Sequence, residues 1–500
     1  MDAISTIISL LSEEEKRDFI TYLQQKNRRT DTKNIQLFQL LDATKKIKNP
    51  DIILYGKASK NTYYALYKRL YDTLIDFVAT KSFENETSEE LEIFKMVLAS
   101  RIFFEHKKHK IAFKTIDKAE KKATAHDFYS ILGEIYQTKI QYAHLPNSEP
   151  LEGLITKFRA NQQLVQQEEH LNLVYAIIKK QLLIGDIAVE QQDIAEIITQ
   201  TLTNHNIIIS DALTFKSLYQ LMDIGTNVAT ARRDYYTILP FIISAYDIVL
   251  KKPRPPHKHL FYQIAILYMM SNALFRNKEF KLATLYLNTM EQLTQEQSGK
   301  HYASQSGKLF LLKALITNYT GDGQKAIQIL EDYQKTKPYK TTDVQFQLQL
   351  ALMVFYFQQA NFKEAFSTFR SFPHSDKWYT EHIGQDWVIK KQLIEILLHM
   401  ELGNINLVDS RLKSFQRKHY PYLRKIREPR VIAFVQLVTS YYKYPETSSS
   451  QTFVDKVESA FDWKSPKQED IYVMSFYAWL KNKMTKGDLY QTTLTLVNKK

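Results

Sequence analysis

The densest group of chemically capable side chains in this 500-residue sequence is a basic segment at positions 411–430. It holds eight Lys or Arg residues against one acidic residue, Glu428, with tyrosines among them. Cationic side chains bind phosphates and aromatic rings stack on bases, so the segment suits nucleic acid or an acidic protein partner. A solvated helix face anchored by tyrosines would show the same pattern. The candidate partner-binding residues are Arg417, Lys418, Tyr420, Tyr422, Arg424, Lys425 and Arg427.

Two prolines within the segment, and basic groups elsewhere in the chain, also bear on this prediction. Pro421 and Pro429 predict that part of the segment lies outside regular helix, because proline cannot donate a backbone hydrogen bond. Further lysines and arginines gather at 107–122 and 251–258, and a predicted helix over 61–83 mixes them with tyrosines. The net charge of the chain is +13. This charge permits contact with nucleic acid, anionic lipid or an acidic protein, but a Lys-rich composition with solvated helix faces would produce it equally well. DNA binding by the N-terminal helices is the weaker alternative.

The residues that usually carry catalysis are missing or badly spaced. There is no cysteine, which excludes disulfides, thiolate metal sites and cysteine nucleophiles. The loop at 320–325 has two glycines but not the spacing of a phosphate-binding loop. The histidine pair His106 and His109 lies among lysines, which would repel a cation. We therefore predict no catalytic residues, no metal site and no cofactor, in a protein that is not an enzyme.

The elements that would position these side chains are predicted to be helices. Glycine and proline number only 12 and 13, which leaves little room for β-turns and favours long helices with short loops. Residues 89–104 and 110–125 are expected to form a first helical hairpin, and 128–142 with 151–167 a second. Three or more further helices, joined by polar loops, are expected before residue 85. The fold class predicted from these patterns is all-α.

A faint pattern recurs along most of the chain: an apolar or aromatic residue, a small or apolar residue three positions later, and another apolar residue four further on. Copies lie 39 to 49 residues apart, a period typical of stacked helical hairpins. Each hairpin would bury its apolar face only against its neighbours. The central positions of these repeats are Ala112, Leu154, Ala195, Ile238, Ala283, Ala326, Ala365, Val408 and Val457.

Two of these copies, at 362–369 and 280–287, resemble the second helix of a tetratricopeptide repeat. The small residue there allows two helices to approach closely. The units here are longer than the 34 residues of that family, and its Gly-Tyr pair in the first helix is mostly missing. The resemblance implies an α-solenoid of about nine stacked antiparallel hairpins over 88–480. A helical domain or cap at 1–87 and a C-terminal cap or tail at 481–500 would flank it.

A solenoid of this kind presents a concave groove lined mainly by the first helix of each hairpin. We therefore expect a non-enzymatic scaffold or adaptor that binds a peptide or partner protein in the groove, with an acidic partner favoured by the charge. The alternative is a nucleic-acid-associated or regulatory protein that uses the basic groups and the N-terminal helices. The sequence has no secretory signal at its start and no apolar stretch long enough to span a bilayer, so the expected location is the cytoplasm.

Overall fold

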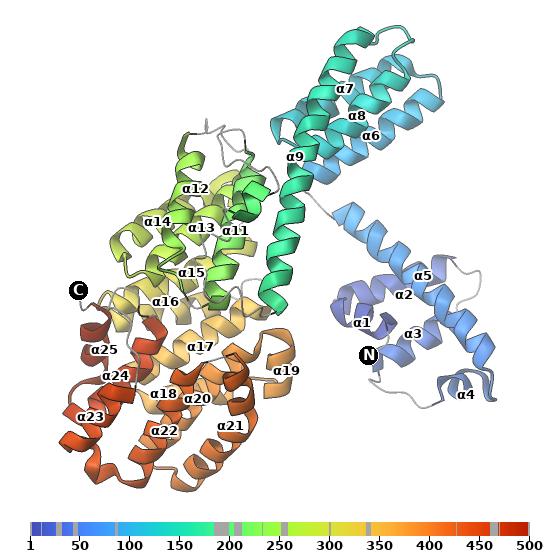
Figure 1. Ribbon diagram of the computed structural model, residues 1–500. Coiled ribbons are helices and arrows are strands. Elements are labelled where there is room, and N and C mark those ends of the chain that lie inside the picture. Colours follow the sequence, from blue (N-terminus) through green and yellow to red (C-terminus); the bar gives the residue numbers. More distant parts are fainter. Residues whose placement is uncertain are drawn as a thin grey trace. The chain divides into compact units, whose positions relative to one another are not determined.

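The computed structural model describes residues 3–11, 13–26, 33–43, 49–85, 89–184, 200–204, 213–232, 234–251, 259–299, 302–336, 342–426, 428–460, 469 and 471–498. Every regular element in these ranges is a helix, and none of them contains a strand (Figure 1). The all-α class predicted from the scarcity of glycine and proline is confirmed.

Contacts divide the chain into two compact units, 1–161 and 162–500. The division falls inside one long helix, α9 (Leu151–Ile184), so it does not coincide with a loop. The sequence predicted only 151–167 for this helix, and the apolar residues that follow extend it. The domain boundaries suggested at 87/88 and 480/481 stay predictions.

The first five helices of unit 1 enclose a core of their own. Phe19 contacts Phe38 and Phe77 at its centre, with ring centroids 4.9 and 5.0 Å apart. Most tyrosines of the basic N-terminal helix pack on this core, whereas Tyr64 is 65% exposed. The helices are α1 (Ala3–Leu10), α2 (Glu13–Lys26), α3 (Lys33–Ala43), α4 (Pro50–Tyr55) and α5 (Lys60–Asn85).

The remaining helices of unit 1 are α6 (Glu89–Glu105), α7 (His109–Ala125) and α8 (Tyr129–Gln141). Helices α6 and α7 pack along their length as the predicted first hairpin, and their ends agree with the prediction within one residue. Ala112 and Ser100 are both fully buried in this pair. Small side chains therefore lie where the two helices approach each other.

In unit 2 consecutive helices pack as pairs, and alternate helices also touch one another. The pairs are α13 with α14, α15 with α16, α17 with α18, and α20 with α21, while α11, α13, α15, α17 and α20 form the row of alternate contacts. These helices are α11 (Phe215–Arg232), α12 (Leu239–Lys251), α13 (Leu260–Arg276), α14 (Phe280–Gly299), α15 (Tyr302–Tyr319), α16 (Gly323–Lys335), α17 (Thr342–Gln358), α18 (Phe362–Arg370), α19 (Asp376–His382), α20 (Gln385–Glu401), α21 (Ile405–Lys425) and α22 (Pro429–Lys443).

The helix pairs share one turn geometry. In five pairs of the two units, the link between the helices contains one residue in the left-handed conformation, and the buried small or apolar position lies five residues later. Only two of these turn residues are glycines, so the sequence gives little local signal for the turn. The turn residues are Lys107, Lys278, Gly321, Ala360 and Gly403, and the buried positions are Ala112, Ala283, Ala326, Ala365 and Val408.

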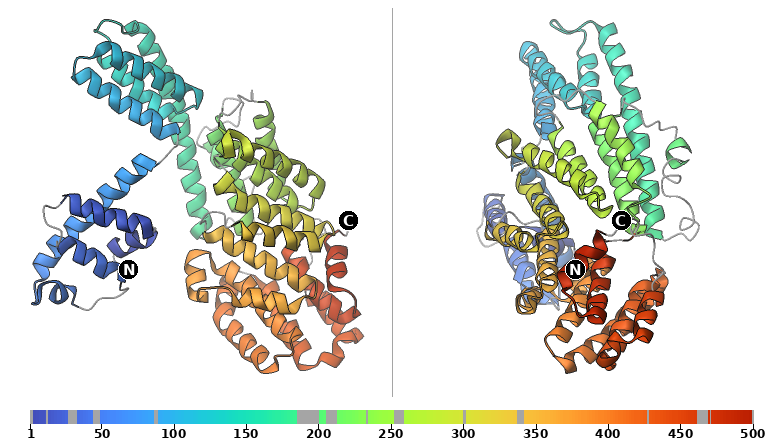
Figure 2. Two further views of the ribbon diagram at one scale, coloured as in Figure 1. Left: turned by 180° about the vertical axis from the view of Figure 1, so that it is seen from behind. Right: turned by 90° about the vertical axis from the view of Figure 1, so that its left-hand side faces the viewer.

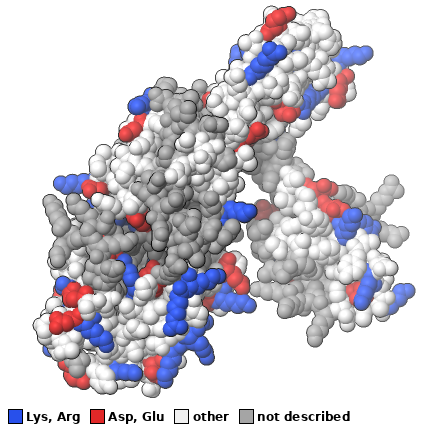
Figure 3. Space-filling model, in the orientation of Figure 1, with Lys and Arg blue, Asp and Glu red and all other residues white. Residues whose placement is uncertain are grey.

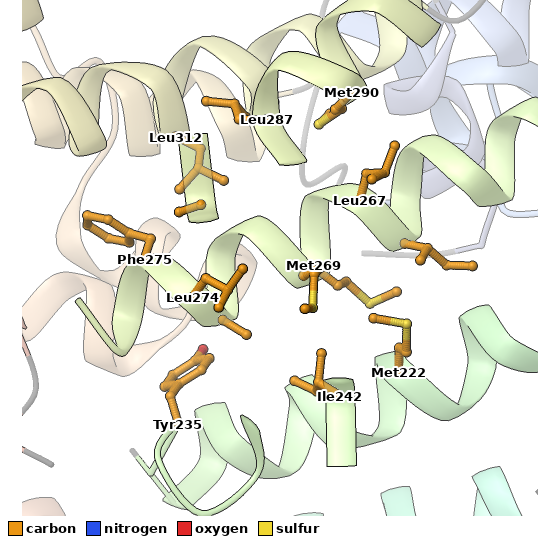
Figure 4. Close-up of a cluster of buried hydrophobic side chains, with 14 of the residues drawn as sticks. Met222, Tyr235, Ile242, Leu267, Met269, Leu274, Phe275, Leu287, Met290 and Leu312 are labelled. Atoms are coloured by element: carbon orange, nitrogen blue, oxygen red, sulfur yellow. The ribbon is translucent and has the colours of Figure 1, made fainter. Parts of the chain in front are cut away.

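The described residues of unit 2 form two main hydrophobic cores, one running from α9 to α17 and the other from α17 to α24 (Ile471–Thr485), so that α17 contributes to both. Figure 4 shows side chains from successive helices meeting in the first of these cores, including Met222, Tyr235, Ile242, Leu267, Met269, Leu274, Phe275, Leu287, Met290 and Leu312. The repeat positions in the described residues, Ala112, Leu154, Ile238, Ala283, Ala326, Ala365, Val408 and Val457, are all at most 1% exposed. Ala195 lies outside the described residues.

The last helices of the chain return to much earlier ones. They are α23 (Gln451–Ala460), after the short 3₁₀ helix η2 (Pro445–Ser449), then α24 (Ile471–Thr485) and α25 (Leu489–Val497). The Tyr490 hydroxyl donates a 2.5 Å hydrogen bond to the main-chain carbonyl of Asn318, and the hydroxyls of Tyr319 and Ser475 lie 2.8 Å apart. Helices α24 and α25 therefore lie beside α15 and the start of α16 (Figures 1 and 2).

Candidate functional site

The basic segment predicted as a partner-binding site lies mainly on α21. Arg417, Lys418, Arg424 and Lys425 are all exposed there, and Arg427 lies outside the described residues. Their spacing places Arg417 and Arg424 on one face of the helix, because seven residues complete two turns. Figure 3 shows Lys and Arg side chains, with some acidic ones, over the region where Figure 1 labels α19 to α21.

Several cations of this segment are neutralised by nearby carboxylates. The nitrogen–oxygen distances are 2.7 Å for Arg411–Glu395, 2.8 Å for Lys413–Asp409, 3.7 Å for Lys418–Asp376 and 2.7 Å for Arg430–Glu469. Arg417, Arg424 and Lys425 form no ion pair with any described residue. The segment therefore presents fewer unpaired charges than its composition indicates.

The two tyrosines of the segment are half-buried. Tyr420 packs against the core, where burial raises its pKa. The guanidinium of Arg424 lies 5.9 Å from its ring centroid. Tyr422 also packs there, and its hydroxyl donates a 3.4 Å hydrogen bond to Asp386. These contacts anchor α21 to the rest of the unit.

The two prolines were expected to hold part of the segment outside regular helix, and α21 does end at Lys425 before α22 begins at Pro429. Pro421, however, does not interrupt the helix, because α21 continues through it. A proline inside a helix removes one backbone hydrogen bond. Burial of Phe415, His419 and Leu423 on the inner face of α21 accounts for its continuation, since each is at most 2% exposed.

A buried ion cluster in unit 1 was not predicted from the sequence. The ammonium of Lys139, only 1% exposed, contacts the carboxylates of Asp117 at 2.7 Å, Glu120 and Glu149. Lys157 also contacts Glu120 and Glu149, at 3.0 and 2.7 Å. Three carboxylates this close resemble a cation site, but the lysine ammonium already occupies the position between them. The cluster ties together α7, α8 and the start of α9.

A cavity of about 460 Å³ lies in unit 2, against the row of alternate helices. Its walls come from α11, α13, α15, α17 and α20, and from α24 of the C-terminal helices. Leucine side chains and aromatic rings form about half of the lining, and polar or charged side chains form much of the rest. This volume and mixture are typical of ligand pockets.

Three polar residues of the cavity follow one another on α13. Tyr268, Asn272 and Arg276 are four residues apart, so they share one face of the helix. Burial raises the pKa of Tyr268 to about 12. The Arg276 guanidinium lies 4.4 Å from the ring centroid of Tyr235 and 4.8 Å from that of Tyr472. Stacking of this kind holds the guanidinium plane in place.

Helix α20 brings a second cation to the cavity. The Lys390 ammonium lies 4.6 Å from the Tyr472 ring centroid, so the same ring serves Arg276 and Lys390. Trp387, one turn earlier on α20, is 8% exposed, and its indole nitrogen is buried without a hydrogen-bond partner among the described residues. The Thr226 hydroxyl, on the α11 wall, is also buried without a partner there.

None of the cavity residues was predicted from the sequence. Their one recognisable feature is on α13, where Tyr268, Asn272 and Arg276 recur at a helical spacing in a mostly apolar helix. The other contributors come from α11, α15, α17, α20 and α24, and the last two helices lie more than a hundred residues away in the sequence. Only the packing of the helices brings them together.

Comparison with known proteins gives no relative from which a function could be transferred. No family model matches the chain, and no curated protein is significantly similar to it. None of the helices in the described ranges is long and apolar enough to cross a membrane. The function must therefore be argued from the site.

Proposed function

We propose that this protein is a non-enzymatic scaffold or adaptor that binds a peptide or a segment of a partner protein in the unit 2 cavity. Its helix pairs form a tetratricopeptide-like α-solenoid, and the row of alternate helices is the binding face. The observation that carries the proposal is the 460 Å³ cavity on that row. Repeat proteins of this architecture present binding surfaces along the corresponding helices.

The repeated turn supports the solenoid part of the proposal. In pairs that are far apart in the sequence, a residue with left-handed backbone conformation lies five positions before the buried helix position. One supersecondary unit used repeatedly produces such a constant offset. The lining of the cavity supports binding, because ligand pockets typically combine apolar and aromatic side chains with a limited number of polar groups.

The test is a selection from a displayed peptide library. Wild type is expected to enrich a set of related peptides, and Ala351→Trp, which places an indole in the cavity, should lose them. Lys363→Trp is the matched control, because Lys363 is exposed on α18 and does not line the cavity. Peptides that bind Ala351→Trp as tightly as wild type would remove the cavity from the proposal.

The second candidate function is nucleic-acid association through α21. The observation in its favour is the exposure of Arg417, Arg424 and Lys425 without carboxylate partners among the described residues. Phosphate binding weakens steeply as salt rises, because bound counterions are released. Binding of single- and double-stranded oligonucleotides, measured at increasing salt, decides this candidate; affinity that stays negligible at low salt would dismiss it.

A further inference from the structure

Most polar side chains that line the cavity already have partners within the chain. The charged ones, Arg276, Asp386 and Lys390, contact aromatic rings or accept hydrogen bonds from neighbouring helices. The hydroxyls of Tyr319 and Ser475 lie 2.8 Å apart and pair with each other. These groups hold the walls of the cavity together, so they are not the ones that remain for a ligand.

Tyr268 and Asn272 on α13 are different. Both line the cavity and are only partly buried, and neither the hydroxyl nor the side-chain amide forms a hydrogen bond with a described residue. Both groups also keep accessible surface, unlike the Trp387 indole nitrogen and the Thr226 hydroxyl. Polar groups in such positions normally have a hydrogen-bond partner. Within the described lining they are the two half-buried polar groups that a ligand can reach.

The two side chains offer different hydrogen-bonding groups. Burial raises the pKa of Tyr268 to about 12, so its hydroxyl keeps its proton at neutral pH and donates. The Asn272 amide both donates and accepts. The Lys308 ammonium lies 5.4 Å from the Tyr268 ring centroid and supports the ring from the side of α15. A neutral ligand with alternating carbonyl and N–H groups complements this pair, and a peptide main chain is such a ligand.

The spacing of the pair also matches an extended peptide. Tyr268 and Asn272 are four residues apart on one helix face, which is about 6 Å along the axis. An extended chain advances about 6.6 Å over two residues and presents the carbonyl and N–H of every second residue on the same edge. The two side chains can therefore meet the main chain at residues two apart.

The cavity is open to solvent and has walls for side chains. Thr230 on α11 and Gln347 on α17 both line it and are exposed, so the cavity reaches the surface of unit 2. A peptide segment can therefore enter from solvent. The leucine side chains and aromatic rings that form about half of the lining suit apolar side chains of such a segment.

We propose that the cavity holds its peptide in an extended conformation by the main chain. The Tyr268 hydroxyl donates to a peptide carbonyl, and the Asn272 amide pairs with the main chain two residues away. Main-chain hydrogen bonds of this kind give affinity, while the apolar wall selects side chains. This inference rests on the proposed function, because it assigns how the peptide is held in that same cavity.

The experiment uses one peptide enriched by wild type and a series of its ester analogues. Each analogue has one main-chain N–H replaced by oxygen, which removes a donor and weakens the adjoining carbonyl as an acceptor, while every side chain stays the same. Wild type should bind the analogue altered at the N–H that faces Asn272 about fivefold more weakly, the usual effect of losing one hydrogen bond. The analogue with a weakened carbonyl facing Tyr268 should lose less.

Three variants are titrated with the same series. Asn272→Leu, which keeps a side chain of similar size, should bind the parent peptide about fivefold more weakly and show no further loss with the first analogue. Tyr268→Phe, which removes only the hydroxyl, should abolish the loss with the second. Asn288→Leu is the matched control, because Asn288 is exposed on α14 and does not line the cavity; it should retain both losses. Melting curves establish that each variant is folded.

The outcomes separate the two proposals. Ester losses that persist unchanged in Asn272→Leu and Tyr268→Phe would overturn the inference and leave the proposed function standing. An ester series that binds wild type as tightly as the parent peptide would do the same, because side chains alone would then hold the peptide. If wild type enriches no peptide, the proposed function fails and the inference with it.

Discussion

The hydroxyl of Ser271 on α13 donates a 2.8 Å hydrogen bond to the main-chain carbonyl of Ala283 on α14. Both residues are fully buried. A side chain this short can reach the backbone of the next helix only if the two helices are very close. The small residue at the centre of the sequence repeat is therefore the point at which the paired helices meet.

Replacing Ala283 with Leu should overpack this contact and lower the free energy of unfolding by about 1–3 kcal/mol. Ala365→Leu should act in the same way on α17 and α18. Chemical denaturation measures both, with Lys281→Leu as the control, because Lys281 is exposed on the same helix. A control as destabilising as Ala283→Leu would show that added bulk at the helix contact is not the cause.

Lys139→Met should destabilise unit 1 strongly. Removing one partner of a buried ion pair costs about 3–5 kcal/mol, and here three carboxylates would lose their central cation. Lys157→Met, at a side chain that is 44% exposed, should cost much less, at most about 1 kcal/mol. Equal losses in the two variants, measured by thermal unfolding at neutral pH, would contradict the assigned roles.

Acid should weaken the same cluster in wild type. Burial acts to raise the pKa of Glu149, but hydrogen bonds from Lys139 and Lys157 together outweigh it and hold the pKa below its ordinary value of 4.5. Its stabilisation is therefore complete above that value and is lost as the pH falls through the lower folded-state pKa. Unfolding of Glu149→Gln should depend less on pH in this window, and an unchanged dependence would contradict the prediction.

The buried His419 should cause a second loss of folding stability at mildly acidic pH. Burial, followed by the nearby Lys418 charge, lowers its pKa from 6.5 to about 4, and its ring nitrogens pair with Gln385 and Gln392. The unfolded chain binds a proton between these two values and the folded chain does not, so stability falls as the pH drops from 6.5 to 4. His419→Gln should flatten this part of a stability–pH curve; a curve of unchanged slope would exclude His419 as its source.

The basic surface of α21 makes a different prediction. Changing Lys418, Arg424 and Lys425 to Glu should leave the Tm nearly unchanged, because all three are exposed and, among the residues that the structure describes, only Lys418 of the three has an ion-pair partner, at 3.7 Å. The variant should bind an acidic partner or an oligonucleotide more weakly, and its affinity should depend less on salt. Binding identical to wild type across a salt series would rule this surface out.

Local patterns in the sequence predicted the helices and the tight helix contacts. Helical periodicity and side-chain size can be recognised within a short stretch of sequence. They predicted the hairpin of α6 and α7 and the buried positions Ala112, Ala283 and Ala365. Pro421 was misjudged because packing of α21 outweighs the preference of a single residue. Sequence spacing could indicate neither the ion cluster nor the cavity, because only helix packing brings their residues together. This holds for Lys139, Glu149 and Lys157 in the cluster and for Arg276, Lys390 and Tyr472 in the cavity.

Photo-cross-linking from inside the cavity tests the central claim most directly. A photoreactive amino acid replaces Asn272, which lines the cavity on α13, or Lys363, which is exposed on α18. A peptide enriched by wild type is added to each protein and the cross-linked product is mapped by mass spectrometry. Binding in the cavity predicts a cross-link from position 272 and little from position 363; efficient cross-linking from 363 with none from 272 would contradict it.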